Sequence, residues 1–177
     1  MSSNLVHMTR WLSDQEQRLW RDFLRVHIDL QAAIGRDLQV SSGLAAGEFQ
    51  VLVHLSEAPE RRLRVTELAH SMRWERSRLS HQLSRMEKRG LIIRRECPED
   101  ARGAFAELTP RGADAIEAAA PAHVETVRRV LFDTLTQDQL RSLGEICATV
   151  LAGLDQGASG APGVSGSSSD PGMEGSR

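Results

Sequence analysis

The residues of this chain best suited to chemistry form one face of a predicted helix within residues 74–108. Leu79, Leu83 and Met86 recur at the spacing of a buried helical face. The remaining surface of that helix is cationic or able to donate and accept hydrogen bonds, through Ser77, Arg78, Ser80, His81, Ser84, Arg85 and Lys88. Such a helix fits the major groove of duplex DNA, where arginine can bind guanine through two hydrogen bonds. An ordinary solvated helix face is the alternative, and the helix alone does not decide between them.

A β-hairpin is predicted directly after this helix, which runs into Gly90. Residues 91–93 favour a strand, residues 98–103 form a polar tip, and Phe105 and Leu108 alternate in a return strand. An arginine at a protruding tip, here Arg102, suits the narrow and electronegative minor groove. Asp100 can orient that guanidinium through a charge-assisted bond. An ordinary exposed turn would also contain Asp, Pro and Gly, but helix and hairpin together favour duplex DNA as the partner.

The charge distribution supports this interpretation. Residues 61–111 contain 13 Lys or Arg against 7 Asp or Glu, a net charge of +6, whereas the whole chain has a net charge of −2. A basic segment within a mildly acidic protein is typical of a DNA-binding module.

The elements before this helix complete a helix-turn-helix. Arg64 and Val65 are predicted as a short strand, and Thr66 as the N-cap of a short helix. A turn at residues 73–75 then leads into the second helix. Trp74 in that turn is interpreted as a packing residue that fixes the angle between the two helices.

Long helices are predicted on both sides of this centre. Ser13 and Glu16 form a capping box before a helix to about Gln39, and a second helix spans about 46–57. Thr109 and Pro110 begin a helix to about Leu135, which Pro121 is expected to kink or interrupt. A second capping box at 136–139 opens a last helix to about Leu154.

The expected fold class is mainly α with a small β-wing: a winged helix-turn-helix domain flanked by long N- and C-terminal dimerisation helices. Residues 13–154 form this single domain, with 45–109 as the winged helix-turn-helix lobe and 13–44 and 110–154 as dimerisation helices. Residues 1–12 are expected to be a flexible arm. Residues 155–177 contain six Gly, six Ser and two Pro and are expected to be a disordered tail.

The motifs of this chain resemble those of the MarR family of bacterial winged-helix regulators. The resemblance spans residues 13–153 and is strongest in Leu68-Ala69, SRLSHQLSRMEKRGLI, Asp100-x-Arg102-Gly103, and Leu108-Thr109 followed by Gly112. It implies a homodimer that binds a pseudo-palindromic operator, as a repressor released by a small ligand or by thiol oxidation. It places Ser77, Arg78 and His81 at base contacts, Arg102 in the minor groove and Asp100 as its support. The family often has arginine or another polar group at the position of His81.

The sequence offers two candidate routes for the signal that would release such a regulator. Family members often bind aromatic acids between the dimerisation helices and the DNA-binding lobe, where Trp20, His27 and His54 could line a pocket; a core role for Trp20 is the alternative. Cys97, expected to be exposed beside arginines, is the candidate for a redox switch, with an incidental cysteine as the alternative. Cys147 is expected in the core.

Other classes of function have no motif to support them. The six histidines show no metal-ligand spacing, and no phosphate loop, nucleophile elbow or HExxH motif is present, so neither a metal, a cofactor nor an enzymatic activity is expected. Without a membrane span or a signal peptide, the protein is expected to be cytoplasmic. The third function considered is a winged helix that binds proteins and has no specific DNA site.

Overall fold

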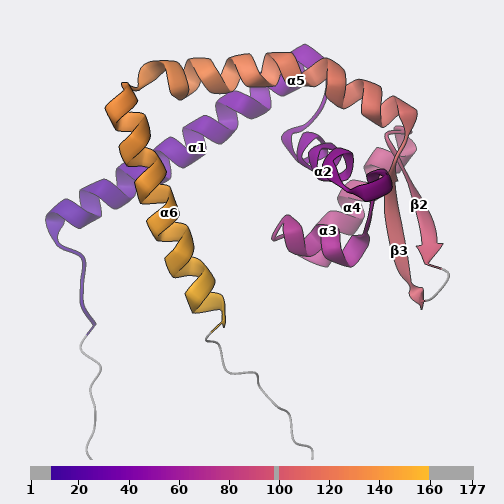
Figure 1. The fold of residues 1–177 in the computed structure, drawn as a ribbon, viewed down its shortest axis with the longest axis horizontal. Helices are drawn as coiled ribbons and strands as arrows, with labels where there is room; N and C mark the ends of the chain where they lie inside the picture. Colours follow the sequence, from indigo (N-terminus) through magenta and orange to yellow (C-terminus); the bar gives the residue numbers. More distant parts are fainter. Residues whose placement is uncertain (1–8, 98–99, 160–177) are drawn as a thin grey trace, which may run out of the picture. The chain divides into compact units, whose positions relative to one another are not determined.

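The computed structural model describes residues 9–97 and 100–159, without the side chains of 100–102 and 157–159. The chain divides into two compact parts, residues 1–134 and 135–177, which are described separately. The fold is mainly helical with one small sheet, as predicted (Figure 1). In the first part α1 (Asp14–Ser42), α2 (Ala46–Glu57) and a short 3-10 turn, η1 (Pro59–Arg61), come first. They are followed by β1 (Arg62–Arg64), α3 (Val65–Ser71), α4 (Arg76–Lys88), β2 (Ile92–Cys97), β3 (Asp100–Leu108), α5 (Pro110–Val130) and η2 (Phe132–Thr134).

The three strands form an antiparallel sheet in the order β1-β3-β2. The hairpin of β2 and β3 is the predicted wing, and its register pairs Ile92 with Leu108 and Arg95 with Phe105. The strand β1 pairs with the other edge of β3. A winged helix-turn-helix lobe is therefore present.

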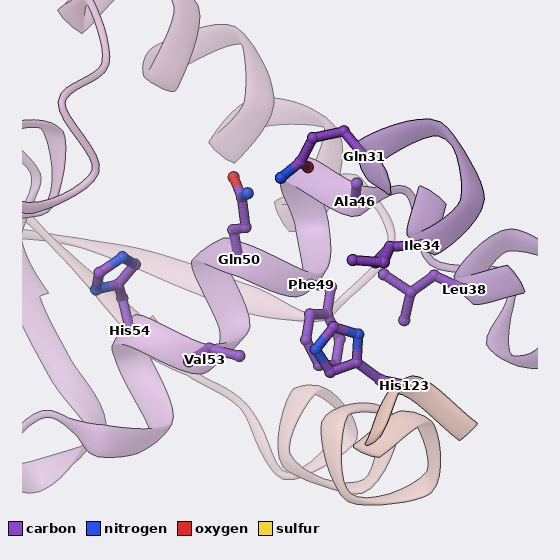
Figure 2. A pocket seen from close by; sticks show the side chains of 9 residues that line it. All are labelled: Gln31, Ile34, Leu38, Ala46, Phe49, Gln50, Val53, His54 and His123. Carbon is purple, nitrogen blue, oxygen red and sulfur yellow. The ribbon is translucent and has the colours of Figure 1, made fainter. Parts of the chain in front are cut away.

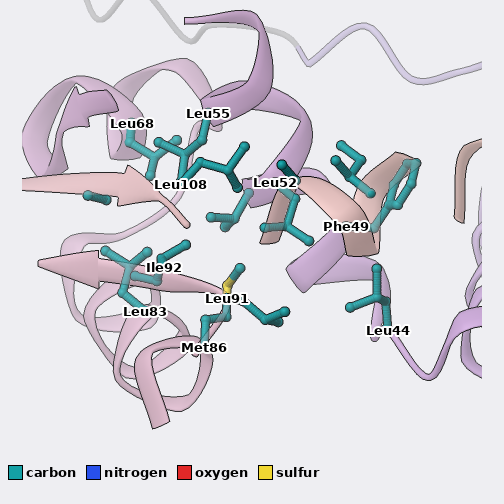
Figure 3. Packing of buried hydrophobic residues seen from close by; sticks show 14 of the residues in the cluster. Leu44, Phe49, Leu52, Leu55, Leu68, Leu83, Met86, Leu91, Ile92 and Leu108 are labelled. Carbon is teal, nitrogen blue, oxygen red and sulfur yellow. The ribbon is translucent and has the colours of Figure 1, made fainter. Parts of the chain in front are cut away.

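The hydrophobic core of the lobe lies where α2, α3, α4 and the wing meet (Figure 3). Leu79, Leu83 and Met86, the apolar face predicted from the spacing in α4, are completely buried. Burial of each side chain of this size stabilises the fold by about 1.5–3 kcal/mol. They pack in a cluster with α2, α3 and the sheet, which includes Leu52, Leu55, Leu68, Ile92 and Leu108. The core therefore fixes which face of α4 points outward.

The junction between the wing and α5 is built around Thr109. Its hydroxyl caps α5 by accepting the N–H of Gly112 at 3.0 Å, and it lies 2.7 Å from the carbonyl oxygen of Gly90. Pro110 occupies the first turn, as predicted. A Cβ atom on Gly112 would lie only 2.1 Å from the carbonyl oxygen of Leu91. Glycine at position 112 therefore allows the start of α5 to pack against the backbone of Leu91.

In the same part of the chain, hydrogen bonds join α1 and α5 near their C-terminal ends. Asp37 accepts hydrogen bonds from the hydroxyl of Thr126, at 2.9 Å, and from the guanidinium of Arg129. Thr126 is buried although it is polar, and this hydrogen bond satisfies it. Pro121 lies on the exposed side of α5 and does not interrupt the helix.

Several predicted boundaries were wrong. Val65 begins α3 instead of ending a strand, because the carboxylate of Glu67 accepts the backbone N–H of Arg64 and caps the helix. Thr66 therefore lies within the first turn and is not the N-cap. The first helix ends at Ser42 and is capped by Gly43, which has a φ of 68°, and α5 ends at Val130 instead of about 135.

In the second part of the chain, α6 (Gln137–Ser159) begins at the predicted capping box. The backbone of Thr136 donates to Gln139, and the hydroxyl of Thr136 accepts from the backbone of Gln139. The helix includes Asp155–Ser159, which had been assigned to the tail. The rest of the tail and most of the predicted arm lie outside the described residues.

The substitution Gly112→Ala is expected to lower the free energy of unfolding by about 3 kcal/mol, because the added methyl group collides with a backbone atom that cannot move aside. The matched control is Gly35→Ala in α1, where the new Cβ would be 3.8 Å from Ala46. That variant should be as stable as the wild type or about 0.5–1 kcal/mol more stable. Urea denaturation followed by circular dichroism measures both. Equal stability of the two variants would contradict the packing described at the junction.

Candidate nucleic-acid interface

The outer face of α4 presents the side chains that the sequence predicted as DNA contacts. Ser77, Arg78, Ser80, His81, Arg85 and Lys88 are exposed, and Ser84 is half-buried. Five of them line a shallow concavity along the helix: Arg78, His81, Ser84, Arg85 and Lys88. The helix therefore brings these predicted residues onto one continuous polar surface.

Arg78 is held against an aromatic ring. Its guanidinium carbon lies 4.1 Å from the ring centroid of Trp74, well inside the range of a cation–π interaction. Trp74 is partly buried and packs against the core, which confirms its predicted role in packing. A Cβ on Gly47 of α2 would lie 3.0 Å from Cη2 of the indole. The guanidinium of Arg78 therefore packs on an indole that in turn packs on α2.

The carboxylate of Glu48 joins α2 to the end of α4. Glu48 is buried, with 5% of its surface exposed. It accepts a hydrogen bond from Arg89 at the end of α4 and another, of 3.0 Å, from the backbone N–H of Ala45. Arg89 also donates to the carbonyl oxygen of Gly43. No local sequence pattern indicates this pair, because 41 residues separate its two members.

Arginines of the wing are paired with carboxylates. Arg94 donates to Glu87 of α4 at 2.8 Å, and Arg95 donates to Glu107 of β3 at 2.7 Å. The side-chain hydrogen bond from Arg94 holds the pKa of Glu87 below its ordinary value. The first pair therefore fastens the wing to the recognition helix. Asp100 and Arg102 belong to β3, but their side chains lie outside the described residues, and their roles stay predictions.

A second polar groove separates α3, α4 and the wing. The sequence predicted Ser80 as a DNA contact but did not predict this groove. Arg64 of β1 lines this groove, and the guanidinium carbons of Arg62 and Arg64 lie 5.3 and 5.2 Å from the ring centroid of Phe105. The groove is lined by Arg64, Val65, Thr66, Arg76, Ser80, Leu83, Arg94, Gly103 and Ala104. Its basic and hydroxyl side chains suit phosphate oxygens.

A cavity of about 280 Å³ lies between α1, α2 and α5 (Figure 2). His54 lines it, as the sequence predicted, whereas Trp20 and His27 do not. Trp20 instead stacks on Phe23 on the exposed side of α1, with 5.9 Å between the ring centroids. The cavity is lined by Gln31, Ile34, Leu38, Ala46, Phe49, Gln50, Val53, His54 and His123.

His123, which was not predicted from the sequence, contributes a buried polar atom to this cavity. Its Nδ1 atom is buried and has no hydrogen-bond partner among the described residues. Its ring packs on Phe49, with 4.5 Å between the centroids. Burial lowers the pKa of His123, so the imidazole is neutral at neutral pH. The sequence offered no signal for this residue, because an isolated histidine in an alanine-rich helix has no motif.

Both cysteine environments were predicted wrongly. Cys97, expected at the surface, is buried at the end of β2, and Cys147, expected in the core, is exposed on α6. The strand register is irregular between Glu96 and Cys97, and the side chain of Cys97 is buried although those of Arg95 and Glu96 are exposed. A thiol in that position is shielded from oxidants, which removes the main support for a redox switch.

Within residues 9–97 and 100–159, no three histidine, cysteine or acidic side chains are grouped so that they could hold a metal ion. Among the helices of the same residues, none is both long enough and apolar enough to cross a membrane.

Fold and site together define a winged helix-turn-helix protein with an exposed polar recognition helix. A model of the MarR family matches residues 42–103. The chain superposes on Sco3205 of Streptomyces coelicolor, a MarR family transcriptional regulator solved in complex with DNA, with a TM-score of 0.78 and 42% identity over 89% of this chain and 96% of that one. It superposes on AbsC of the same organism, another MarR family transcriptional regulator, with a TM-score of 0.76 and 39% identity over 84% and 99% of the two chains.

A third relative is the HTH-type transcriptional repressor YetL of Bacillus subtilis, which is 32% identical over 107 residues. That alignment spans 59% of this chain and 64% of the length of YetL, slightly under two thirds. Because the chain is 42% and 39% identical to Sco3205 and AbsC over nearly their full lengths, it belongs to the MarR family of transcriptional regulators.

Proposed function

We propose that this protein is a homodimeric repressor that binds a pseudo-palindromic site in duplex DNA and is released by a small ligand. The observation that carries the proposal is the outer face of α4, where cationic and hydroxyl side chains gather over a completely buried apolar face. The DNA complex of the similar Sco3205 and the repressor function in the name of YetL support it.

In the proposed complex, α4 enters the major groove. Ser77, Arg78 and His81 contact base edges, and Ser80, Ser84, Arg85 and Lys88 complete the contact surface. Arg102 at the wing enters the minor groove with Asp100 as its support, as the family resemblance implies. The groove between α4 and the wing would follow the phosphate backbone.

Binding of two half-sites requires two copies of α4 about 34–36 Å apart, and the exposed apolar surface of the chain supports a dimer. Leu19, Trp20 and Phe23 of α1 are between 52% and 69% exposed. In α6, Ile146, Val150, Leu151 and Leu154 are at least 55% exposed. Surfaces of this kind are rarely left in water by a monomer, and a second copy of the chain is the proposed partner.

The cavity beside α2 is the proposed ligand site. Its walls are mainly apolar, and its polar groups are amides and imidazoles. The neutral ring of His123, with its unpartnered nitrogen, suits an aromatic compound that can exchange one hydrogen bond with it. His54 is the second polar residue proposed to contact the ligand.

Arg78→Ala is expected to weaken binding to the preferred duplex by about 1–3 kcal/mol, if Arg78 reads a base. The matched control is Arg95→Ala, which should have a smaller effect because Arg95 is paired with Glu107. The preferred duplex is first selected from a random library by the wild-type protein, and gel-shift titrations at one salt concentration then compare the variants.

Equal effects of the two arginine substitutions would show that the recognition face is assigned wrongly. A wild-type protein that enriches no sequence at all would point to the protein-binding winged helix instead. For repression, transcription from the bound promoter should rise when the protein is removed; a fall would identify an activator.

The wild-type protein should have twice its 19.5 kDa chain mass in solution, as measured by light scattering after size exclusion. Phe23→Glu should shift the mass toward the monomer, because it places a charge within the apolar surface of α1. The control is Val40→Glu, which alters an isolated exposed residue at the other end of α1 and should leave the dimer intact. A monomeric wild-type protein would refute the proposed assembly.

A thermal-shift screen of phenols and aromatic carboxylic acids should find compounds that stabilise the wild-type protein and lower its affinity for the selected duplex. His123→Leu should abolish the stabilisation, because it removes the proposed hydrogen bond. His27→Leu, the same change at an exposed histidine outside the cavity, should leave it unchanged. Stabilisation that survives His123→Leu would place the ligand elsewhere.

A further inference from the structure

In the turn between α3 and α4, the indole of Trp74 lies against the guanidinium of Arg78. Trp74 lies two residues before the start of α4, and Arg78 lies one helical turn after it. The ring centroid and the guanidinium carbon are 4.1 Å apart. Contact at this distance holds the guanidinium over the ring by the attraction between a cation and the aromatic face.

Trp74 contacts both α3 and α2. The backbone N–H of Trp74 donates to the carbonyl oxygen of Ala69 in α3 at 2.9 Å. Its six-membered ring lies against Gly47 of α2, where a Cβ atom would approach to 3.0 Å. A side chain at position 47 would therefore crowd the indole.

The way in which Arg78 is held differs from that of its neighbours. Arg85, Arg89 and Arg94 each donate hydrogen bonds to an oxygen of Gln82, Glu48 or Glu87. Those contacts occupy N–H groups that would otherwise be able to donate hydrogen bonds to DNA. Arg78 has no hydrogen bond or ion pair within the described part of the chain, so the ring orients it while its N–H groups remain available.

We infer that Trp74 is a positioning residue for sequence readout: it restrains Arg78 over its ring so that the edge of the guanidinium is presented to a guanine. The inference rests on the proposed DNA-binding function and deepens it. A restrained arginine loses less rotamer freedom on binding than a free one, and both N–H groups needed for a bidentate contact to guanine are unoccupied. Trp74 touches no base itself.

The test is a double-mutant cycle between Trp74→Met and Arg78→Ala. Methionine fills much of the space of the indole with a flexible apolar chain but has no aromatic face. The probes are the duplex that the wild-type protein enriches from a random library and a scrambled duplex of the same length. Affinities for both are measured at one salt concentration, and thermal unfolding of every variant is recorded.

Trp74→Met should weaken binding to the selected duplex about two- to fivefold, the range of an exposed cation–π contact. Binding to the scrambled duplex should stay within twofold, because the phosphate contacts remain. In the Arg78→Ala background, Trp74→Met should cause no further loss on the selected duplex. Trp74→Phe keeps an aromatic face and should recover part of the affinity.

A merely structural role for Trp74 predicts other results. Equal losses on both duplexes, or the same loss with and without Arg78, would overturn the inference. If Trp74→Met does not fold, the cycle with Trp74→Phe carries the test, and an effect independent of Arg78 again overturns it. Failure of the wild-type protein to enrich any duplex would instead refute the proposed function, so the two failures are distinguishable.

Discussion

The arrangement of the DNA-binding lobe depends on one buried carboxylate, that of Glu48. Taking an ion out of water costs several kcal/mol, which only well-placed partners can offset. Glu48 has two, the N–H of Ala45 at the start of α2 and the guanidinium of Arg89 at the end of α4. Removing Arg89 would leave a buried charge without its counterion. The end of α4 is therefore held to the junction of α1 and α2 by electrostatics, while its apolar face is held by packing.

Three successive residues of α2 contact three different parts of the structure, because adjacent side chains on a helix point in different directions. Gly47 meets the indole of Trp74, Glu48 binds Arg89, and Phe49 packs on His123 at the cavity. Both ends of α4 and the wall of the cavity thus meet within a single turn of α2. If a ligand in the proposed site displaced this turn of α2, the contacts at both ends of α4 would be displaced with it.

Much of this lobe could be predicted from the sequence because its signals are local. The spacing of Leu79, Leu83 and Met86 fixed the inward face of α4, and the Thr109-Pro110 cap fixed the start of α5. The cavity around His123 could not be predicted, since its walls come from three helices and no local pattern marks them. The cysteines were placed wrongly because the burial of a side chain at the end of a strand or along a helix depends on neighbours distant in the sequence.

The same long-range contacts change the meaning of the charge count. A net charge of +6 in residues 61–111 suggests a broadly cationic surface, but Arg94 and Arg95 are engaged by Glu87 and Glu107 within that segment. These pairs brace the wing and reduce the field that it presents. Arg76, Arg78 and Lys88 of α4 have no carboxylate partner among the described residues. Their charges are not offset by a neighbouring carboxylate, so α4 contributes to long-range attraction to DNA as well as to the proposed sequence readout.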